Sequence, residues 1–179
     1  MPLPKTILVP TDFGEPSEAA LTYALDFAKA VGAEIVLLHA YEIPVVGFPD
    51  GVLTATGDLT PQILEGARIG LDRQLAGRVD AGVTIRPIVR QGEAFALVNE
   101  VAKEIGADLI VMGTHGRTGI PRALLGSVAE KVVRTASVPV LTIHAGEEEA
   151  PTTRTPARES AVGERTVRSV ANGIPASQR

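Results

Sequence analysis

The stretch Asp108–Ser127, DLIVMGTHGRTGIPRALLGS, determines the expected fold more than any other part of the chain. It begins with the apolar run Leu109–Met112, which predicts a buried β-strand. A glycine-containing loop follows, and a helical pattern starts at Gly126 and Ser127. A strand, a glycine-rich loop and a helix N-terminus in this order present backbone N–H groups to a phosphate. The stretch therefore predicts an α/β protein with an anion-binding loop.

The glycine spacing in this stretch differs from two common nucleotide-binding patterns. The loop contains no GxxxxGK[ST], and its glycines do not fit GxGxxG. The pattern is instead Gly113-x2-Gly116-x9-Gly126-Ser127. Glycine suits such a loop because it adopts positive φ without steric cost and lets an anion approach the backbone closely. The loop alone is weak evidence for a nucleotide site, since strand-to-helix loops are generally rich in glycine.

Apolar periodicity in the rest of the chain predicts strands that alternate with helices. The expected strands are Thr6–Thr11, Glu34–Ala40, Thr84–Arg90, Asp108–Gly113 and Val138–Ile143. Four helices are expected. The first has its N-cap at Ser17 and ends at Gly32, and the second has its N-cap at Thr60 and Pro61 in its first turn. The other two span Glu93–Ile105 and Ser127–Ala136.

Strict alternation of strands and helices predicts a parallel sheet with helices on both faces. Pro87 cannot donate a hydrogen bond to a neighbouring strand, so its strand is expected at an edge of the sheet. Residues 41–59 contain several glycines and prolines and show little periodicity, which predicts a long loop over one end of the sheet. We expect one doubly wound α/β domain with five parallel strands in the order 3-2-1-4-5.

Three segments together resemble the universal stress protein family, in its ATP-binding branch. The first is the glycine pattern described above. KTILVPTDFGEPSEAAL, residues 5–21, resembles the first strand and helix of the family, and SVPVLTI, residues 137–143, resembles its last strand. The similarity covers about residues 4–145. It implies a Rossmann-like nucleotide-binding domain over residues 1–146.

The resemblance also implies which residues contact a nucleotide. Asp12 follows the first strand and is expected near the ribose or adenine, and the backbone of Ala40 is expected to meet the adenine edge. Gly126, Ser127 and the amides just after them are expected at the phosphates, with Arg117 as a charge partner. The full expected set is Pro10, Thr11, Asp12, Ala40, Met112, Gly113, His115, Gly116, Arg117, Gly126, Ser127, Val128 and Ala129.

Several of these residues also have a purely structural interpretation. Ser127 and Glu130 form the spacing of a capping box, which satisfies the first N–H groups of a helix without any ligand. Asp12 could simply form a turn. Ala129 lacks the hydroxyl that many relatives carry, which removes one phosphate contact worth about 1 kcal/mol. His115 is a possible general base, although the resemblance implies only that it lies near the nucleotide.

Composition excludes several classes of protein. The 179 residues are 45% hydrophobic but only 3% aromatic, so the core must consist mainly of Ala, Val, Leu and Ile. A net charge of −4 argues against nucleic acid or an anionic membrane as the main partner. The chain has no Cys, which excludes disulfides and thiolate catalysis. No apolar run reaches the roughly 20 residues of a membrane span, and no signal peptide is recognisable, so we expect a cytoplasmic protein.

The last part of the chain differs in character from the rest. Residues 147–179 contain five Glu, five Arg and three Pro but no aromatic residue. Such a segment buries too little apolar surface to offset the entropy lost on ordering. We expect a disordered polar tail.

The expected function is that of an ATP-binding, nucleotide-responsive stress or regulatory module. Mg²⁺ or Mn²⁺, if present, would be held mainly by the phosphates, because no cluster of metal ligands is recognisable. One alternative is a slow ATP hydrolase or phosphotransferase that uses His115 or Asp12. Another is a homodimeric interaction module with a vestigial nucleotide pocket. A homodimer is expected through the last strand, Val138 to Ile143, since apolar sheet edges favour strand pairing.

Overall fold

The computed structural model describes residues 2–43, 45–48, 51–54, 59–78, 82–114 and 125–144. All of them belong to one compact unit, Met1–Glu147, and a second unit comprises Glu148–Arg179. The expected tail and the loop residues His115, Gly116 and Arg117 therefore lie outside the described part of the chain.

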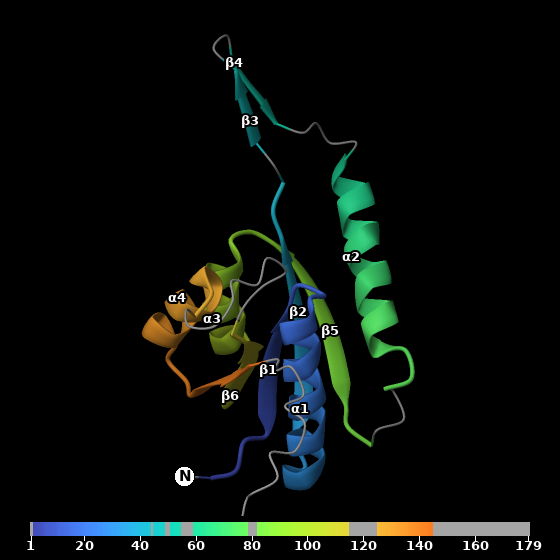
Figure 1. The fold of residues 1–179 in the computed structure, drawn as a ribbon, viewed down its shortest axis with the longest axis vertical. Helices are drawn as coiled ribbons and strands as arrows, with labels where there is room; N and C mark the ends of the chain where they lie inside the picture. The colour runs from blue at the N-terminus through green and yellow to red at the C-terminus, as the bar shows by residue number, and fades with distance from the viewer. Residues whose placement is uncertain are drawn as a thin grey trace, which may run out of the picture. The chain divides into compact units, whose positions relative to one another are not determined.

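Strands and helices alternate through most of the described chain (Figure 1). The elements in order are β1 (Thr6–Thr11), α1 (Glu15–Val31), β2 (Glu34–Tyr41), β3 (Val45–Phe48), β4 (Gly51–Thr54), α2 (Leu59–Leu75), β5 (Ile85–Gln91), α3 (Ala94–Glu104), β6 (Leu109–Gly113), α4 (Ser127–Thr135) and β7 (Val140–Ile143).

The main sheet has five strands in the order β5-β2-β1-β6-β7, and all of its pairs are parallel. This confirms the expected order 3-2-1-4-5, because the short strands β3 and β4 form a separate pair. β5 lies at an edge, as its Pro87 predicts, and Pro87 is in register with Leu37 of β2. The central strand β1 is fully buried at Ile7, Leu8 and Val9.

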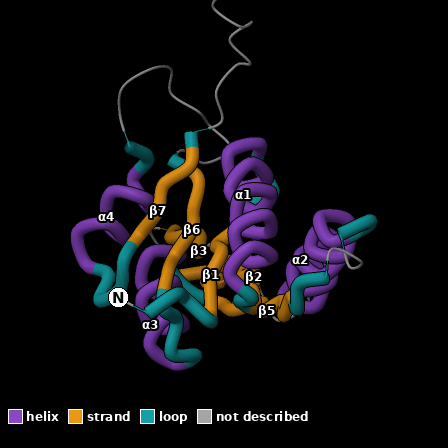
Figure 2. The backbone as a smooth tube through the Cα atoms, turned by 90° about the horizontal axis from the view of Figure 1, so that it is seen from below, coloured by secondary structure: helices purple, strands orange, loops and turns teal. Residues whose placement is uncertain are grey.

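Helices cover both faces of the main sheet (Figure 2). Alternate residues of β1 face opposite sides, so Ile7 and Val9 pack in one core cluster with α1 and Leu71 of α2. Leu8 packs in the other cluster, which contains Val98 of α3 and other residues of α3 and α4. The two clusters contain almost only aliphatic residues, as the low aromatic content requires.

Two predicted helix starts are wrong. α1 begins at Glu15 after an N-cap at Gly14, so Ser17 lies inside the helix instead of capping it. The Ser17 hydroxyl donates to the Gly14 carbonyl oxygen at 2.8 Å, and proline in the first turn favours the earlier start. α2 begins at Leu59, which places Thr60 within the helix. The predicted end of α1 is confirmed, because Gly32 adopts a left-handed conformation with φ of 72°.

Part of the segment predicted as a long loop forms an antiparallel hairpin. β3 pairs with β4, with Val45 opposite Thr54 and Phe48 opposite Gly51. Two short apolar runs separated by only two residues are a hairpin signal. The glycines and prolines around them obscured this signal in the sequence.

Candidate functional site

The functional site expected from the sequence lies where β1 and β6 end. These strands are adjacent and parallel, with Ile7 opposite Leu109 and Leu8 opposite Ile110. From β1 the chain crosses to β2 on one side of the sheet, whereas β6 and β7 lie on the other side. Ligands of open α/β sheets bind at such a reversal of strand order, outside the carboxyl ends of the strands. We refer to this region as the carboxyl edge.

Four predicted contact residues lie together on one face of the sheet near this edge. Pro10 follows Leu8 by two residues, and Met112 follows Ile110, so both face the side covered by α3 and α4. Ala40 continues the same alternation in β2, which is directly paired with β1. Met112 and Ala129 of α4 pack in the same core cluster. Four residues expected to contact the nucleotide therefore lie on the same side of the sheet.

The turn between β1 and α1 positions Asp12. The Gly14 N–H donates to Asp12 Oδ1 at 3.0 Å, and the Phe13 N–H donates to Thr11 Oγ1 at 3.1 Å. Phe13 adopts a φ of 64°, which is uncommon for a residue other than glycine. Asp12 thus forms a turn, as its structural interpretation predicted, and this turn holds its carboxylate at the carboxyl edge.

A buried network of hydrogen bonds links this turn to α2. Thr11 Oγ1 donates to Gln74 Oε1 at 2.9 Å and lies 3.2 Å from Ser17 Oγ. All three side chains belong to residues that are at most 6% exposed. Gln74 was not among the residues expected at the site. The available signal was its position three residues after Leu71, on the side of α2 that faces the sheet.

His39, at the end of β2, adds a second support for the same turn. Its Nδ1 lies 2.9 Å from the Thr11 carbonyl oxygen, and because a carbonyl only accepts, Nδ1 carries the proton. The imidazole stacks on the Phe13 ring, with centroids 4.3 Å apart and an angle of 29° between the planes. These contacts hold the ends of β1 and β2 in a fixed arrangement beside Ala40.

Gly113 is required by packing at the end of β6. A Cβ atom at this position would lie 2.8 Å from the backbone carbon and oxygen of Pro16, in the first turn of α1. Such a contact cannot be relieved by moving a flexible side chain. The absence of a side chain at Gly113 therefore lets the start of α1 lie close to the end of β6.

Hydrogen bonds at Thr114 join the end of β6 to β7 and to the start of α4. The Thr114 N–H donates to the Ile143 carbonyl oxygen of β7 at 2.9 Å. The Gly126 N–H donates to the Thr114 carbonyl oxygen at 2.7 Å. Thr114 Oγ1 also lies 3.1 Å from His144 Nδ1. The last residue before the loop is thus tied both to β7 and to the residue that precedes α4.

The N-terminus of α4 presents backbone N–H groups beside Thr114 for which the described residues provide no acceptor. The first N–H groups of a helix have no intrahelical acceptor, and the helix dipole makes this end electropositive. The Gly126 N–H is bonded to Thr114, so the donors without a partner in the described ranges are the N–H groups of Ser127, Val128 and Ala129. A small anion is the ligand that such an arrangement favours.

The predicted capping box is wrong. Gly126, with φ of −60° and ψ of 154°, is the N-cap of α4, and no side chain caps it. Ser127 is the first helical residue and is exposed, while Glu130 Oε1 lies 2.9 Å from Arg134 Nη2. Ala129 is only 3% exposed and packs in the core, which explains a small residue there. Among the residues that the structure describes, no side chain therefore caps the backbone amides of this first turn.

Within the described residues, no group of three or more His, Cys, Asp or Glu residues is arranged to hold a metal ion. Among their helices, none has the length and apolar character that crossing a membrane requires.

Comparison with known proteins identifies the relatives of this chain. The model of the universal stress protein family matches residues 4–144. Universal stress protein MJ0531 of Methanocaldococcus jannaschii is 36% identical over 141 residues, covering 78% of this chain and 81% of its own. Universal stress protein MJ0577 of the same organism is 30% identical over 152 residues, covering 78% of this chain and 94% of its own.

Solved structures agree with the sequence matches. The structure of MJ0577 superposes with a TM-score of 0.68 at 27% identity, covering 81% of this chain and 99% of that one. A universal stress protein solved in complex with cAMP superposes with a TM-score of 0.56 at 30% identity, covering 80% of this chain and 99% of that one. Sequence and fold thus agree over the whole α/β unit, and this chain belongs to the universal stress protein family.

Proposed function

We propose that this protein binds ATP at the carboxyl edge, between the turn after β1 and the N-terminus of α4. The proposal rests on the start of α4. There the amides of Ser127, Val128 and Ala129 follow directly after Gly126, whose own N–H is bonded to Thr114. The cAMP bound by a relative at 30% identity supports a nucleotide as the ligand. The glycine pattern Gly113-x2-Gly116-x9-Gly126-Ser127 supports a ligand with several phosphates.

Each part of the nucleotide has proposed partners in the chain. The phosphates accept hydrogen bonds from the first turn of α4 and from the loop residues His115, Gly116 and Arg117. Asp12 accepts from the ribose hydroxyls. The adenine contacts the backbone of Ala40, and the side chains of Pro10 and Met112 provide an apolar surface for it. Thr11 supports the site through the turn that holds Asp12.

A divalent cation fits this proposal as a companion of the phosphates. No cluster of metal ligands exists among the described residues, so Mg²⁺ or Mn²⁺ would be coordinated mainly by phosphate oxygens and water. Asp12 is a carboxylate at the carboxyl edge, and its Oδ1 already accepts from the Gly14 N–H. When bound, the cation would neutralise phosphate charge beside an electropositive helix end.

The proposed role is that of a nucleotide-responsive regulatory module in a stress response. Membership of the universal stress protein family supports this role. Hydrolysis would need a base with an orienting partner near the terminal phosphate, and His115 is the candidate in the sequence. We further propose that two copies pair through β7, which lies at an edge of the main sheet and carries Leu141 and Ile143.

Calorimetric titration with ATP tests the site. A valine side chain at Gly116 or Gly126 should obstruct the phosphates and weaken binding by about 2–4 kcal/mol, roughly 30- to 1000-fold. Gly126 has an ordinary φ of −60°, so the effect at that residue should come from obstruction and not from backbone strain. Ser127→Ala serves as the control, because it keeps the backbone amide and should change affinity little. Unchanged affinity in both valine variants would contradict the proposed site.

Phosphate release measured on the same samples tests for an enzyme. If the protein is a binding module, His115→Ala should leave any slow release unchanged while ATP still binds. A fall of about 100-fold with intact affinity would assign the protein to the hydrolases instead.

A further inference from the structure

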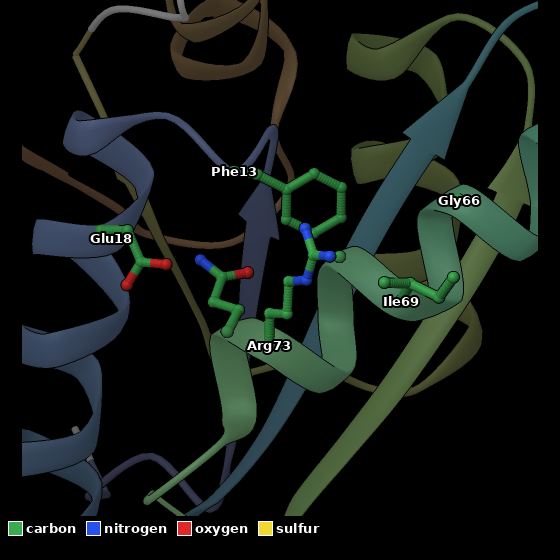
Figure 3. Close-up of a pocket in the computed structure, with 7 residues that line it drawn as sticks. Phe13, Glu18, Gly66, Ile69 and Arg73 are labelled. Atoms are coloured by element: carbon green, nitrogen blue, oxygen red, sulfur yellow. The ribbon is translucent and has the colours of Figure 1, made fainter.

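A hollow of about 480 Å³ lies between α1 and α2 (Figure 3). Its walls are formed by Phe13 in the turn before α1, by Glu18 of α1 and by one side of α2. These helices cover the sheet face opposite to the one that carries Met112 and Ala129. The hollow is therefore separate from the site at the N-terminus of α4.

A buried amide in the wall of this hollow lacks one hydrogen-bond partner. Gln74 is only 5% exposed and lines the hollow. Its Oε1 accepts from Thr11, but its Nε2 has no partner among the described residues. Buried polar atoms are nearly always paired in folded proteins, because an unpaired one loses its hydration without compensation. The Nε2 group is suited to donate to an acceptor that enters the hollow.

Two glycines in α2, Gly66 and Gly70, leave part of the wall of the hollow without a side chain. Glycine within a helix destabilises it relative to alanine, so each needs a reason. Gly70 is explained by packing, since a Cβ there would lie 2.6 Å from the Phe13 ring. A Cβ at Gly66 would meet no described atom within 4 Å, yet Gly66 lines the hollow. Packing does not require this glycine, whereas a ligand that approaches the α2 backbone would.

The charges around the hollow favour an anion. Glu18 is neutralised by Arg78, whose Nη1 lies 2.7 Å from Glu18 Oε2. Arg73 lines the hollow and makes no ion pair with any residue in the described ranges. In Figure 3, Arg73 extends from α2 toward the ring of Phe13. The uncompensated charge is therefore positive, and it lies next to an apolar wall that also includes Ile69.

We propose that this hollow binds a small organic carboxylate with an aromatic or apolar body. The carboxylate accepts hydrogen bonds from the Arg73 guanidinium and from Gln74 Nε2, and the body packs against Phe13 and Ile69. The oxygen of the same amide, Gln74 Oε1, accepts a hydrogen bond from Thr11 at 2.9 Å, so the bound carboxylate is linked through Gln74 to the end of β1. The proposal does not depend on nucleotide binding.

Benzoate is a suitable probe, with benzyl alcohol as a matched ligand that lacks the carboxylate. NMR spectra of the full ¹⁵N-labelled chain should show saturable shifts of the Gln74 side-chain amide and of the Gly66 and Gly70 backbone amides with benzoate. Benzyl alcohol should bind at least tenfold more weakly, because it cannot form charge-assisted hydrogen bonds.

Two variants and one control test the residues. Arg73→Gln should weaken benzoate binding about tenfold or more. Arg68→Gln, which changes an exposed arginine of α2 outside the hollow, should leave it unchanged. Gly66→Leu should fill the hollow and abolish binding without lowering the unfolding temperature, since leucine favours a helix and no described atom obstructs it.

The outcomes separate the proposal from unspecific binding. Saturable benzoate binding that is lost in Arg73→Gln and Gly66→Leu but kept in Arg68→Gln supports it. Absence of saturable shifts up to about 20 mM benzoate would overturn it. Equal responses to benzyl alcohol, or equal losses in the two arginine variants, would also overturn it.

Discussion

Replacing Thr11 by valine removes one hydroxyl from the end of β1 and keeps the shape of the side chain. Two groups then lose their partner: the Phe13 N–H, which donates to Thr11 Oγ1 at 3.1 Å, and Gln74 Oε1, which accepts at 2.9 Å. An orphaned buried group costs about 1–3 kcal/mol. Because the Phe13 amide is only partly buried, we expect Thr11→Val to lower the free energy of unfolding by about 2–4 kcal/mol in total.

The partner variant should cost much less. Gln74→Leu removes Oε1 together with Nε2, which is unpaired in the described structure, and it leaves the Thr11 hydroxyl 3.2 Å from Ser17 Oγ. We therefore expect a loss below about 1 kcal/mol. In the double variant no Gln74 oxygen is left without a partner. The free energy of unfolding that it loses should therefore be smaller, by about 1–2 kcal/mol, than the sum of the losses in the two single variants.

Urea unfolding followed by circular dichroism measures these free energies. The slope of the free energy of unfolding against urea concentration should be the same for all four proteins, since the surface exposed on unfolding hardly changes. A free energy of unfolding for Thr11→Val within about 0.5 kcal/mol of the original chain, or additive losses in the double variant, would contradict this role of the Thr11 hydroxyl.

Three further predictions concern other parts of the domain. Gly113→Ala should destabilise the domain by about 1–3 kcal/mol in the same urea assay, because the new Cβ meets the Pro16 backbone at 2.8 Å; unchanged stability would show that α1 moves freely. The N–H groups of Lys5 and Thr6 hold the pKa of Asp108 below its ordinary value, so this carboxylate stabilises the fold above about pH 4 and that contribution is lost as the pH falls through the lowered pKa. Unfolding midpoints of Asp108→Asn and the original chain should differ at pH 7 and converge at low pH; a constant difference would contradict the titration. Leu141→Arg should give monomers in sedimentation, and a monomeric original chain at concentrations on the order of 10 µM would contradict the proposed dimer.

The sheet was predictable because its signals are local. The runs Ile7–Val9 and Val36–Leu38 are fully buried in the structure, and an uninterrupted apolar run predicts this from sequence. Pro87 likewise predicts an edge strand by its chemistry alone. The start of α1 was not predictable in the same way, because it depends on a turn whose bonds to Thr11 and Asp12 are visible only in three dimensions.

The candidate site was predictable only in part. The residues at the ends of β1, β2 and β6 and at the start of α4 follow from the spacing and from the family resemblance. The link between Thr11 and Gln74 joins residues 63 positions apart, and nothing in either local sequence specifies the pairing. The packing reason for Gly113 is equally non-local, because it depends on Pro16 of another element.

The proposed nucleotide site is tested most directly by an ATP titration followed on the backbone amides of the full ¹⁵N-labelled chain. The proposal predicts saturable shifts at Ser127, Val128 and Ala129, whose amides would donate to the phosphates, together with shifts around Asp12. Adenosine, which lacks phosphates, should shift the residues around Ala40 but leave the first turn of α4 nearly unchanged. If saturating ATP leaves the amides of Ser127 to Ala129 unshifted, the phosphates do not bind at α4 and the proposed site is wrong.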